Sequence, residues 1–376
     1  MQFRIMPNND DRLSILGFGL MRLPVKEDGN INESETLSLL HYAFENGVNY
    51  FDTAWSYHQG KNEPLLGRFL REIDRSKVFA ATKLPVWLVK SEADFDTFLN
   101  SQLEHLQTDY IDYYLMHGLR GESWKEMQKL GATEFLLKAK EAGKIRHIGF
   151  SFHDDFPAFQ QIADSGPWEF CQLQHNWFDV HNEAGVRGIQ YASAKGLGIV
   201  IMEPIMGGKL AGNIPSEAEE IWRQSRFAVS PAERALRFVW NYPQVQVVLS
   251  GMNKMEQVHE NINAASLAKA NSLPPEELKL YDQVRQIYKN KMVVHCTGCG
   301  YCLPCPNNVA IPSVLGIYND AHMFGDKKRH QMEYNFFIKA EQKADQCTKC
   351  GTCLSRCPQK IDIPQEMEKV KAYFSE

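Results

Sequence analysis

The sequence lacks any long apolar segment. No apolar run approaches the roughly 18 residues that a helix needs to span a bilayer. The start of the chain, Met1–Pro7, also lacks the long apolar segment of a signal peptide. We therefore expect a cytoplasmic protein with no membrane partner.

An excess of positive charge is also lacking. Lysine and arginine total 41 against 46 aspartates and glutamates, which gives a formal net charge of −5. This balance argues against a nucleic-acid partner. With 44% hydrophobic and 23% charged residues, the composition is that of a folded protein rather than a disordered or fibrous one. The 376 residues suffice for two domains, or for one large barrel with an appendage.

Cysteine is almost absent from the first three-quarters of the chain. Of the nine cysteines, only Cys171 lies there, and the other eight fall between Cys296 and Cys357. A secreted protein held by disulfides would spread its cysteines along the chain, so this crowding indicates a metal or cluster site. We expect Cys171 to be an ordinary buried residue.

Short β-rich runs alternate with amphipathic stretches over the first two-thirds of the chain. Several of the runs are nearly continuously apolar, which is typical of strands buried on both faces. Leu37, Leu40 and Phe44 keep helical spacing, and Ser230-Pro231 is a typical helix start. The predicted core strands span residues 14–20, 49–53, 77–83, 110–117, 145–151, 170–176, 198–203 and 245–251.

This alternation predicts a (β/α)8 TIM barrel, an α/β fold that takes about 250 residues. The rival fold, an open doubly wound sheet, is disfavoured because no Gly-x-Gly-x-x-Gly fingerprint follows any of the predicted strands. We expect the barrel to occupy residues 1–290. A small, mostly helical ferredoxin-like domain is expected over residues 291–376.

Polar side chains close three consecutive predicted strands. Asp52 ends the second strand, Lys83 the third and His117 the fourth, and Tyr57 follows in the loop after Asp52. Chemistry in such barrels takes place at the C-terminal ends of the strands. A lysine or histidine there is costly to bury without a partner, and Asp52 is the natural counter-ion for Lys83. Any one of these four could be an ordinary turn or core residue, but together they indicate an active site.

These four residues lie in segments that resemble the aldo-keto reductase family. The resemblance runs from about residue 13 to about residue 270 and is carried by residues 47–57, 62–67, 81–83, 109–117 and 148–151. It implies that the family's catalytic tetrad of Asp, Tyr, Lys and His falls on Asp52, Tyr57, Lys83 and His117.

The residue types suit the reduction of a carbonyl group by hydride transfer, which needs a proton for the developing alkoxide. Tyr57 is the candidate acid, although the ordinary pKa of a tyrosine, about 10, is too high for efficient transfer near neutral pH. The Lys83 cation favours the phenolate and thereby lowers that pKa, while Asp52 keeps Lys83 charged. A neutral His117 would orient the carbonyl oxygen and help to select the substrate.

The resemblance also implies a nicotinamide cofactor. Ser151 and Gln172 match the family's contacts to the carboxamide, whereas Phe152 stands where Asn is usual and Met202 replaces the stacking aromatic residue. The further cofactor residues that the resemblance implies are Gly19, Met21, Gly207, Gly208, Asn253, Gln257 and Asn261.

The choice between NADP(H) and NAD(H) stays open. Family members often pair the 2′-phosphate of NADP(H) with a Lys and an Arg, and Gly251 and Gln257 occupy those places here. Lys254 is the candidate substitute if the cofactor is NADP(H).

The eight C-terminal cysteines form two motifs that are typical of iron–sulfur proteins. Residues 347–358 read Cys-x2-Cys-x2-Cys-x3-Cys-Pro, the ferredoxin pattern for [4Fe–4S] clusters, and residues 296–306 have one residue fewer before the last cysteine. In two-cluster ferredoxins the fourth cysteine of each motif ligates the other cluster. The expected ligand sets are therefore Cys296, Cys299, Cys302 and Cys357 for one cluster, and Cys347, Cys350, Cys353 and Cys305 for the other. Structural zinc is the alternative, but its four-cysteine sites use two separated Cys-x2-Cys pairs.

Together these features predict an NAD(P)H-dependent aldo/keto reductase of an iron–sulfur-containing subgroup. It would reduce a small-molecule carbonyl substrate and carry two [4Fe–4S] clusters for electron transfer or for structure. The alternative is an electron-transfer or nicotinamide-binding scaffold protein with little reductase activity. Nicotinamide exchanges two electrons as a hydride whereas each cluster moves one, and we find no flavin fingerprint in the sequence. Another cofactor or a redox partner protein would have to connect the two.

Overall fold

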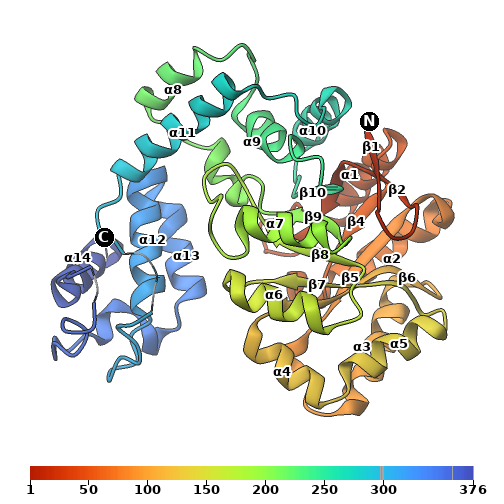
Figure 1. Cartoon of the computed structure of the whole chain (residues 1–376), viewed down its shortest axis with the longest axis horizontal. Coiled ribbons are helices and arrows are strands. Elements are labelled where there is room, and N and C mark those ends of the chain that lie inside the picture. The colour runs from red at the N-terminus through yellow and green to blue at the C-terminus, as the bar shows by residue number, and fades with distance from the viewer. Residues whose placement is uncertain (297, 299, 358, 376) are drawn as a thin grey trace. The chain divides into compact units, whose positions relative to one another are not determined.

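A computed structural model describes residues 1–296, 298, 300–357 and 359–375 of the chain (Figure 1). The contacts divide the chain into two compact units, which we describe separately. The first unit comprises Met1–Gly208 and Val229–Pro274, and the second comprises Lys209–Ala228 and Pro275–Glu376. The domain boundary expected at residue 290 stays a prediction. By contacts alone, the helix before that residue groups with the C-terminal segment.

The first unit is a closed barrel of eight parallel strands, which confirms the predicted fold. The strands follow one another around the barrel in chain order, and β10 closes it between β9 and β3. Every predicted strand range overlaps one of the observed strands. The strands are β3 (Leu16–Gly19), β4 (Tyr50–Asp52), β5 (Phe79–Leu84), β6 (Ile111–Leu119), β7 (Ile145–Phe152), β8 (Phe170–Gln174), β9 (Gly198–Met202) and β10 (Val247–Ser250).

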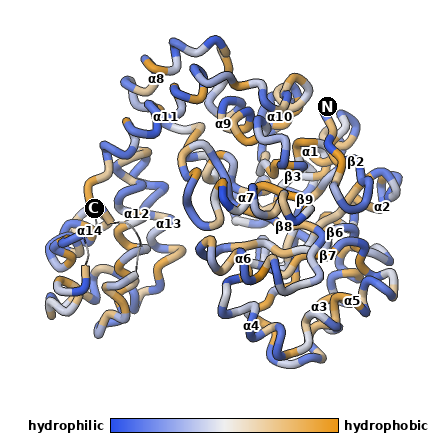
Figure 2. Tube along the Cα trace, in the orientation of Figure 1, coloured by the Kyte–Doolittle hydropathy of each residue, from blue (hydrophilic) through white to orange (hydrophobic). Residues whose placement is uncertain are grey.

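Helices connect the strands of this unit, and Figure 2 shows that they carry both apolar and polar residues, as helices do that cover a core on one side. Helix α9 begins as predicted, since Ser230 Oγ accepts a hydrogen bond from the backbone N–H of Glu233 at 3.0 Å and Pro231 follows as the first residue. The helices are α1 (Glu33–Glu45), α2 (Asn62–Glu72), α3 (Glu92–Leu106), α4 (Gly121–Lys129), α5 (Ala132–Glu141), α6 (Phe156–Ser165), α7 (Gly185–Ala194), α9 (Pro231–Trp240) and α10 (Met255–Leu267). Among the helices of the described residues, none combines the length and apolarity that a membrane crossing requires.

An antiparallel hairpin precedes the barrel. Its strands β1 (Phe3–Ile5) and β2 (Arg12–Ser14) pair with Phe3 opposite Ser14. Met6 and Leu13 of this hairpin belong to one buried apolar cluster with residues of six barrel strands, including Tyr113 and Phe170. The hairpin therefore adds apolar side chains to the core that the barrel strands share.

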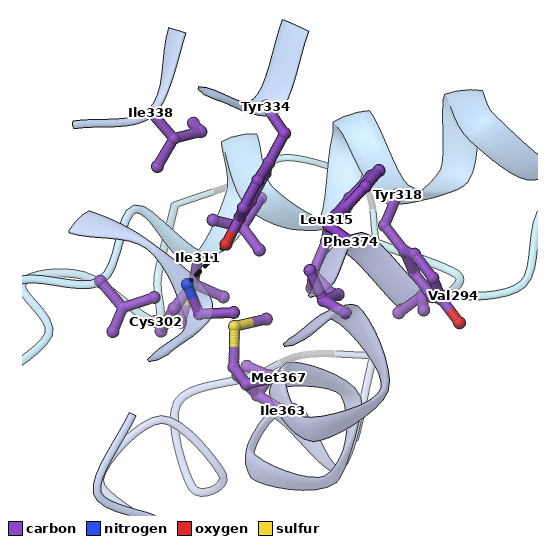
Figure 3. Close-up of a cluster of buried hydrophobic side chains, with 14 of the residues drawn as sticks. Val294, Cys302, Ile311, Leu315, Tyr318, Tyr334, Ile338, Ile363, Met367 and Phe374 are labelled. Atoms are coloured by element: carbon purple, nitrogen blue, oxygen red, sulfur yellow. Dashed lines mark hydrogen bonds between the residues drawn. The ribbon is translucent and has the colours of Figure 1, made fainter. Parts of the chain in front are cut away.

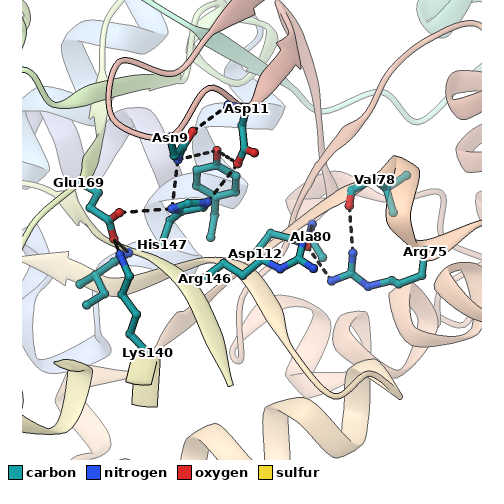
Figure 4. Close-up of polar contacts among 12 residues, drawn as sticks. Asn9, Asp11, Arg75, Val78, Ala80, Asp112, Lys140, Arg146, His147 and Glu169 are labelled. Carbon is teal, nitrogen blue, oxygen red and sulfur yellow. Dashed lines mark hydrogen bonds and ion pairs between the residues drawn. The ribbon is translucent and has the colours of Figure 1, made fainter. Parts of the chain in front are cut away.

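Charged residues form a network at the N-terminal ends of the barrel strands (Figure 4). His147 on β7 lies between Asp11 of the hairpin, at 3.0 Å, and Glu169, at 3.3 Å. Glu169 also accepts hydrogen bonds from Lys140 Nζ at 2.7 Å and from the backbone N–H of Ile148 at 3.0 Å. Burial alone would raise the pKa of Glu169, but these hydrogen bonds outweigh it and lower the pKa to about 2. Glu169 is thus ionised in the folded protein and ties the start of β8 to β7.

The second unit is mostly helical, as expected. Trp222, at the end of α8, packs edge-on against Tyr281 of α11 with ring centroids 4.9 Å apart, and this contact helps to join residues 209–228 to the C-terminal segment. Figure 3 shows the apolar core of this unit. In it, the ring of Tyr334 stacks on Phe374, with centroids 4.7 Å apart, and its hydroxyl accepts a hydrogen bond from the backbone N–H of Ala344 at 2.8 Å. The helices are α8 (Ser216–Trp222), α11 (Pro275–Asn290), α12 (Ile311–Phe324), α13 (Lys327–Phe337) and α14 (Ile363–Ser375).

Replacing Glu169 by glutamine is expected to destabilise the protein at pH 7 by on the order of 2–3 kcal/mol, because the folded protein stabilises the carboxylate of Glu169 more strongly than the unfolded chain does. A carboxyl with a lowered pKa contributes stability that is fully present above its ordinary pKa of 4.5 and is lost as the pH falls toward about 2. Denaturant unfolding of both proteins from pH 7 to pH 2 measures this. The difference in the free energy of unfolding between wild type and Glu169→Gln should shrink steadily below pH 4.5.

Glu134→Gln is the matched control, because Glu134 makes a solvent-exposed helical ion pair with Lys138 and such pairs contribute little. Its unfolding midpoint should equal that of the wild type. A Glu169→Gln protein as stable as the wild type at pH 7 would contradict the role assigned to the network.

Candidate functional site

The structure brings together the four residues predicted to form the catalytic tetrad. Asp52 is the last residue of β4, Lys83 lies at the end of β5, and Tyr57 begins the short helical turn Tyr57–Gly60 that follows β4. His117 lies near the end of β6, where the pairing with β7 shifts its register and Gly118 adopts a positive φ of 63°. All four line one cavity of about 160 Å³.

Lys83 is the centre of this group. Its side chain is 1% exposed, and its Nζ donates to Asp52 Oδ1 at 2.6 Å and to the carbonyl oxygen of Thr53 at 2.7 Å. Tyr57 Oη lies 3.4 Å from the same Nζ. Burial lowers the pKa of Lys83, but Asp52 and Tyr57 raise it by more, so that the net shift is upward. Lys83 is therefore a buried ammonium directed at the tyrosine hydroxyl.

The pKa of Tyr57 differs from the expectation. Burial raises it, and the Lys83 cation lowers it, as anticipated, but by less, so that the net shift is upward. The separation of 3.4 Å between Tyr57 Oη and Lys83 Nζ is long for a charge-assisted hydrogen bond, which limits the effect of the cation. In this geometry Tyr57 is a protonated phenol.

His117 faces the same cavity as a neutral imidazole. Its ring stands edge-on to Tyr57, with centroids 6.1 Å apart, and lies 5.0 Å from the ring of Trp87. Burial, assisted by the Lys83 charge, holds the pKa of His117 well below its usual range. Its Nδ1 is buried and has no hydrogen-bond partner among the described residues.

Five of the residues assigned to the cofactor line the tetrad's cavity, namely Gly19, Met21, Ser151, Gln172 and Met202. Gln172 Nε2 is 3.6 Å from Met202 Sδ, while Gln172 Oε1 is buried without a partner among the described residues. Ser151 Oγ already accepts a hydrogen bond from the backbone N–H of Gly118 at 2.7 Å. The unpartnered oxygen of Gln172 is therefore an acceptor ready for a ligand.

Phe152, which replaces the family's usual Asn, does not line this cavity. Its buried ring packs edge-on against Phe159 of α6, with centroids 5.3 Å apart. The next residue, His153, lines the cavity instead, and its Nδ1 lies 3.0 Å from Glu183 Oε1.

A second cavity of about 160 Å³ adjoins the first, because four residues line both: Arg22, Glu203, Leu249 and Gly251. Gly207, Gly208, Asn253 and Gln257, all assigned to the cofactor, line this second cavity. Asn261 lines neither cavity, and its Nδ2 donates to Ser250 Oγ at 3.0 Å.

Sequence reasoning missed Arg22, His153 and Glu203. His153 and Glu203 are polar residues that directly follow the apolar strands β7 and β9, so the strand-end argument that identified the tetrad could also have identified them. Arg22 lies three residues after the end of β3 and carried no comparable signal.

In the second unit the cysteines of the two motifs gather around two small spaces. Cys305 of the first motif lines one space together with Cys347, Cys350 and Cys353 of the second motif. Cys357 of the second motif lines the other space together with Cys296 of the first. Cys302 lines both, and Cys299 lies outside the described residues. Thiolates grouped in this way among apolar side chains are a donor set that fits iron–sulfur clusters. Cys171 is fully buried in β8, where burial raises the pKa of its thiol.

Two family models match the chain. The aldo/keto reductase family model matches residues 15–286, and a 4Fe-4S dicluster domain model matches residues 295–361. The L-galactose dehydrogenase of Arabidopsis thaliana is 25% identical over 311 residues, which cover 77% of this chain and 96% of the relative. The uncharacterized oxidoreductase YqkF of Bacillus subtilis is 27% identical over 319 residues, which cover 77% of this chain and 99% of the relative.

A solved structure has the same fold. The holo form of aldo-keto reductase AKR11C1 from Bacillus halodurans aligns with a TM-score of 0.64 at 24% identity, over 76% of this chain and 96% of that one. Since the first family model covers most of the chain and the structure forms the corresponding barrel, this chain belongs to the aldo/keto reductase family and carries a C-terminal 4Fe-4S dicluster domain.

Proposed function

We propose that the protein is an NAD(P)H-dependent aldo/keto reductase that reduces the carbonyl group of a small molecule, with Tyr57 as general acid. The observation that carries this proposal is the Lys83 ammonium, which Asp52 holds at 2.6 Å and which faces the Tyr57 hydroxyl inside a cavity. We further propose a cytoplasmic location, two [4Fe–4S] clusters, and a redox partner protein if the clusters transfer electrons.

The residues present fit a nicotinamide nucleotide. The buried, unpartnered Oε1 of Gln172 is an acceptor for a carboxamide N–H group. In the adjoining cavity, Gly207 and Gly208 adopt positive φ values of 62° and 98° and carry no side chains, which suits the close approach of phosphate groups to the backbone. A nicotinamide bound beside Gln172, in the cavity of the tetrad, would supply the hydride for the carbonyl carbon.

The protein's own residues supply the proton and the orientation. Tyr57 is a phenol before the reaction and gives its proton to the carbonyl oxygen as negative charge develops there. Lys83 stabilises the tyrosinate that remains, and Asp52 keeps Lys83 in place. The neutral His117 has one N–H to donate to the same oxygen and thus helps to hold the carbonyl group.

Replacing Tyr57 by phenylalanine should lower the rate of carbonyl reduction by about 10²–10⁴-fold, the usual contribution of a general acid. The dissociation constant of the nicotinamide nucleotide should stay within about twofold of the wild-type value, because the residues assigned to the nucleotide lie elsewhere in the two cavities. Steady-state kinetics with a panel of aldehydes, together with nucleotide titration, measures both.

Tyr191→Phe is the control, because it removes a hydroxyl that bonds to Asp164 on the outside of the barrel. Full turnover in Tyr57→Phe would refute the assignment of the acid. A wild-type protein that binds the nucleotide but reduces none of the aldehydes would indicate the nicotinamide-binding scaffold instead.

The protein should discriminate weakly between NADPH and NADH. Gln257 is uncharged and accepts a hydrogen bond from the backbone N–H of Asn253 at 2.9 Å, and Gly251 has no side chain. A charge-assisted contact to the 2′-phosphate is worth about 1.5–3 kcal/mol, more than tenfold in affinity. We therefore expect the two dissociation constants to differ by less than tenfold, and Gln257→Arg to shift the ratio toward NADPH by at least tenfold. A wild-type preference for NADPH above a thousandfold would show that Lys254, Arg22 or another cation has taken the role.

The second unit should contain about eight irons and eight sulfides per chain. Cys305→Ser should damage the cluster that is otherwise held by the second motif, and Cys357→Ser the cluster of the first motif. The support for this expectation is that each of these two thiols lines a space together with cysteines of the other motif. Iron and sulfide analysis and the paramagnetic spectrum of the reduced protein measure this, since two nearby reduced clusters couple magnetically.

Cys171→Ala is the control, because its thiol is buried in the barrel, and it should keep all the iron. Four irons per chain in the wild type would refute the second cluster. Zinc in place of iron after anaerobic preparation would refute both iron–sulfur clusters.

A further inference from the structure

Two carboxylates and an imidazole converge between two helices of the second unit, apart from the cysteines. Asp320 comes from α12, and His330 and Glu333 come from α13. One ligand atom from each side chain lies within 4.8 Å of the others. The proposed function uses none of these three residues.

His330 is held in an orientation typical of a metal ligand. Its side chain is 1% exposed, and its Nδ1 lies 3.0 Å from the carbonyl oxygen of Asp326. Because a carbonyl oxygen only accepts, Nδ1 carries the proton, and in the neutral tautomer the lone pair is on Nε2. Nε2 is buried, has no hydrogen-bond partner among the described residues, and lies 4.0 Å from Glu333 Oε2. Metal-binding histidines commonly donate their other ring N–H to a backbone carbonyl in this way.

The ammonium group of Lys209 bridges the two carboxylates, and Arg329 Nε lies 3.3 Å from Oε1 of one of them, Glu333. Lys209 Nζ lies 2.7 Å from Asp320 Oδ2 and 3.0 Å from Glu333 Oε2. This arrangement gives the carboxylates hydrogen-bond donors but leaves His330 Nε2 without a hydrogen-bond partner among the described residues. A divalent cation in place of the ammonium would bind both carboxylates and also accept the lone pair of the imidazole.

We propose that Asp320, His330 and Glu333 form a binding site for a divalent transition-metal cation. The bound cation takes the place of the Lys209 ammonium group between the two carboxylates. One imidazole and two carboxylates are a donor set that suits Mn²⁺, Fe²⁺ or Zn²⁺. The two carboxylate side chains are 23% and 21% exposed, so that water can reach the remaining coordination positions. The four-carbon stem of Lys209 is flexible and its side chain is 13% exposed, which gives the displaced ammonium group a route to water.

Mn²⁺ is the probe of choice, because it prefers oxygen and nitrogen donors and therefore competes poorly for free thiolates. The full-length protein is loaded with iron and sulfide, oxidised anaerobically and titrated with Mn²⁺, and the free ion is measured by its paramagnetic signal. The wild type should bind about one Mn²⁺ per chain. Lys209→Met removes the competing ammonium and should bind Mn²⁺ at least tenfold more tightly, whereas His330→Gln should bind it at least tenfold more weakly.

Lys343→Met is the control for the loss of a lysine in the same unit, because Lys343 bonds to Asn335 at the surface, and it should match the wild type. If His330→Gln loses its cluster absorbance or its helical circular dichroism, Glu333→Gln replaces it and should weaken binding in the same way. The proposal is overturned if Lys209→Met binds no more tightly than the wild type, or if the folded ligand variant binds as well as the wild type. Absence of saturable binding in both the wild type and Lys209→Met also overturns it.

Discussion

The buried ion pair between Lys83 and Asp52 is the constraint on which the active site depends. Removing two charged groups from water costs several kcal/mol for each group. This cost is offset only if the two groups lie close together and further hydrogen bonds satisfy their remaining donors and acceptors. The barrel meets the first requirement because β4 and β5 are adjacent and parallel, so that their C-terminal ends bring the two side chains to 2.6 Å. The carbonyl oxygen of Thr53 accepts a further hydrogen bond from Lys83, whereas Asp52 Oδ2 is buried without a partner among the described residues. The charge of Lys83 also acts on Tyr57 and His117. It opposes the effect of burial on the pKa of Tyr57, and it adds to the effect of burial on the pKa of His117.

Much of this site could be predicted from the sequence because strands that are consecutive in the chain are neighbours in the barrel. Asp52, Lys83 and His117 are far apart in the chain, but each closes an apolar strand, and the ends of consecutive parallel strands lie side by side. The cysteine motifs were predictable for a similar reason, since their spacing reflects how a short loop surrounds a cluster. The structure groups Cys305 with the second motif although the first motif is one residue shorter than the ferredoxin pattern.

The remaining features depend on side-chain direction and burial, which a resemblance does not supply. Successive residues of a strand point to opposite faces, so the cavity is lined by Ser151 and His153 while Phe152 packs against Phe159 in the helical layer. The direction of the net pKa shift of Tyr57 depends on the balance between desolvation and a cation 3.4 Å away, and that balance is a property of the folded geometry rather than of the residue types. Asn261 matches a family position, but its amide is already bonded to Ser250.

The second unit is assembled from two stretches of chain, and this has a consequence for biosynthesis. Residues 209–228 leave the ribosome before any other part of that unit, and they are followed by α9, β10 and α10 of the barrel. The contact between Trp222 and Tyr281 therefore cannot form until almost sixty further residues have been synthesised. The nascent barrel thus carries an unfinished segment of the iron–sulfur unit before any of the eight C-terminal cysteines has been translated.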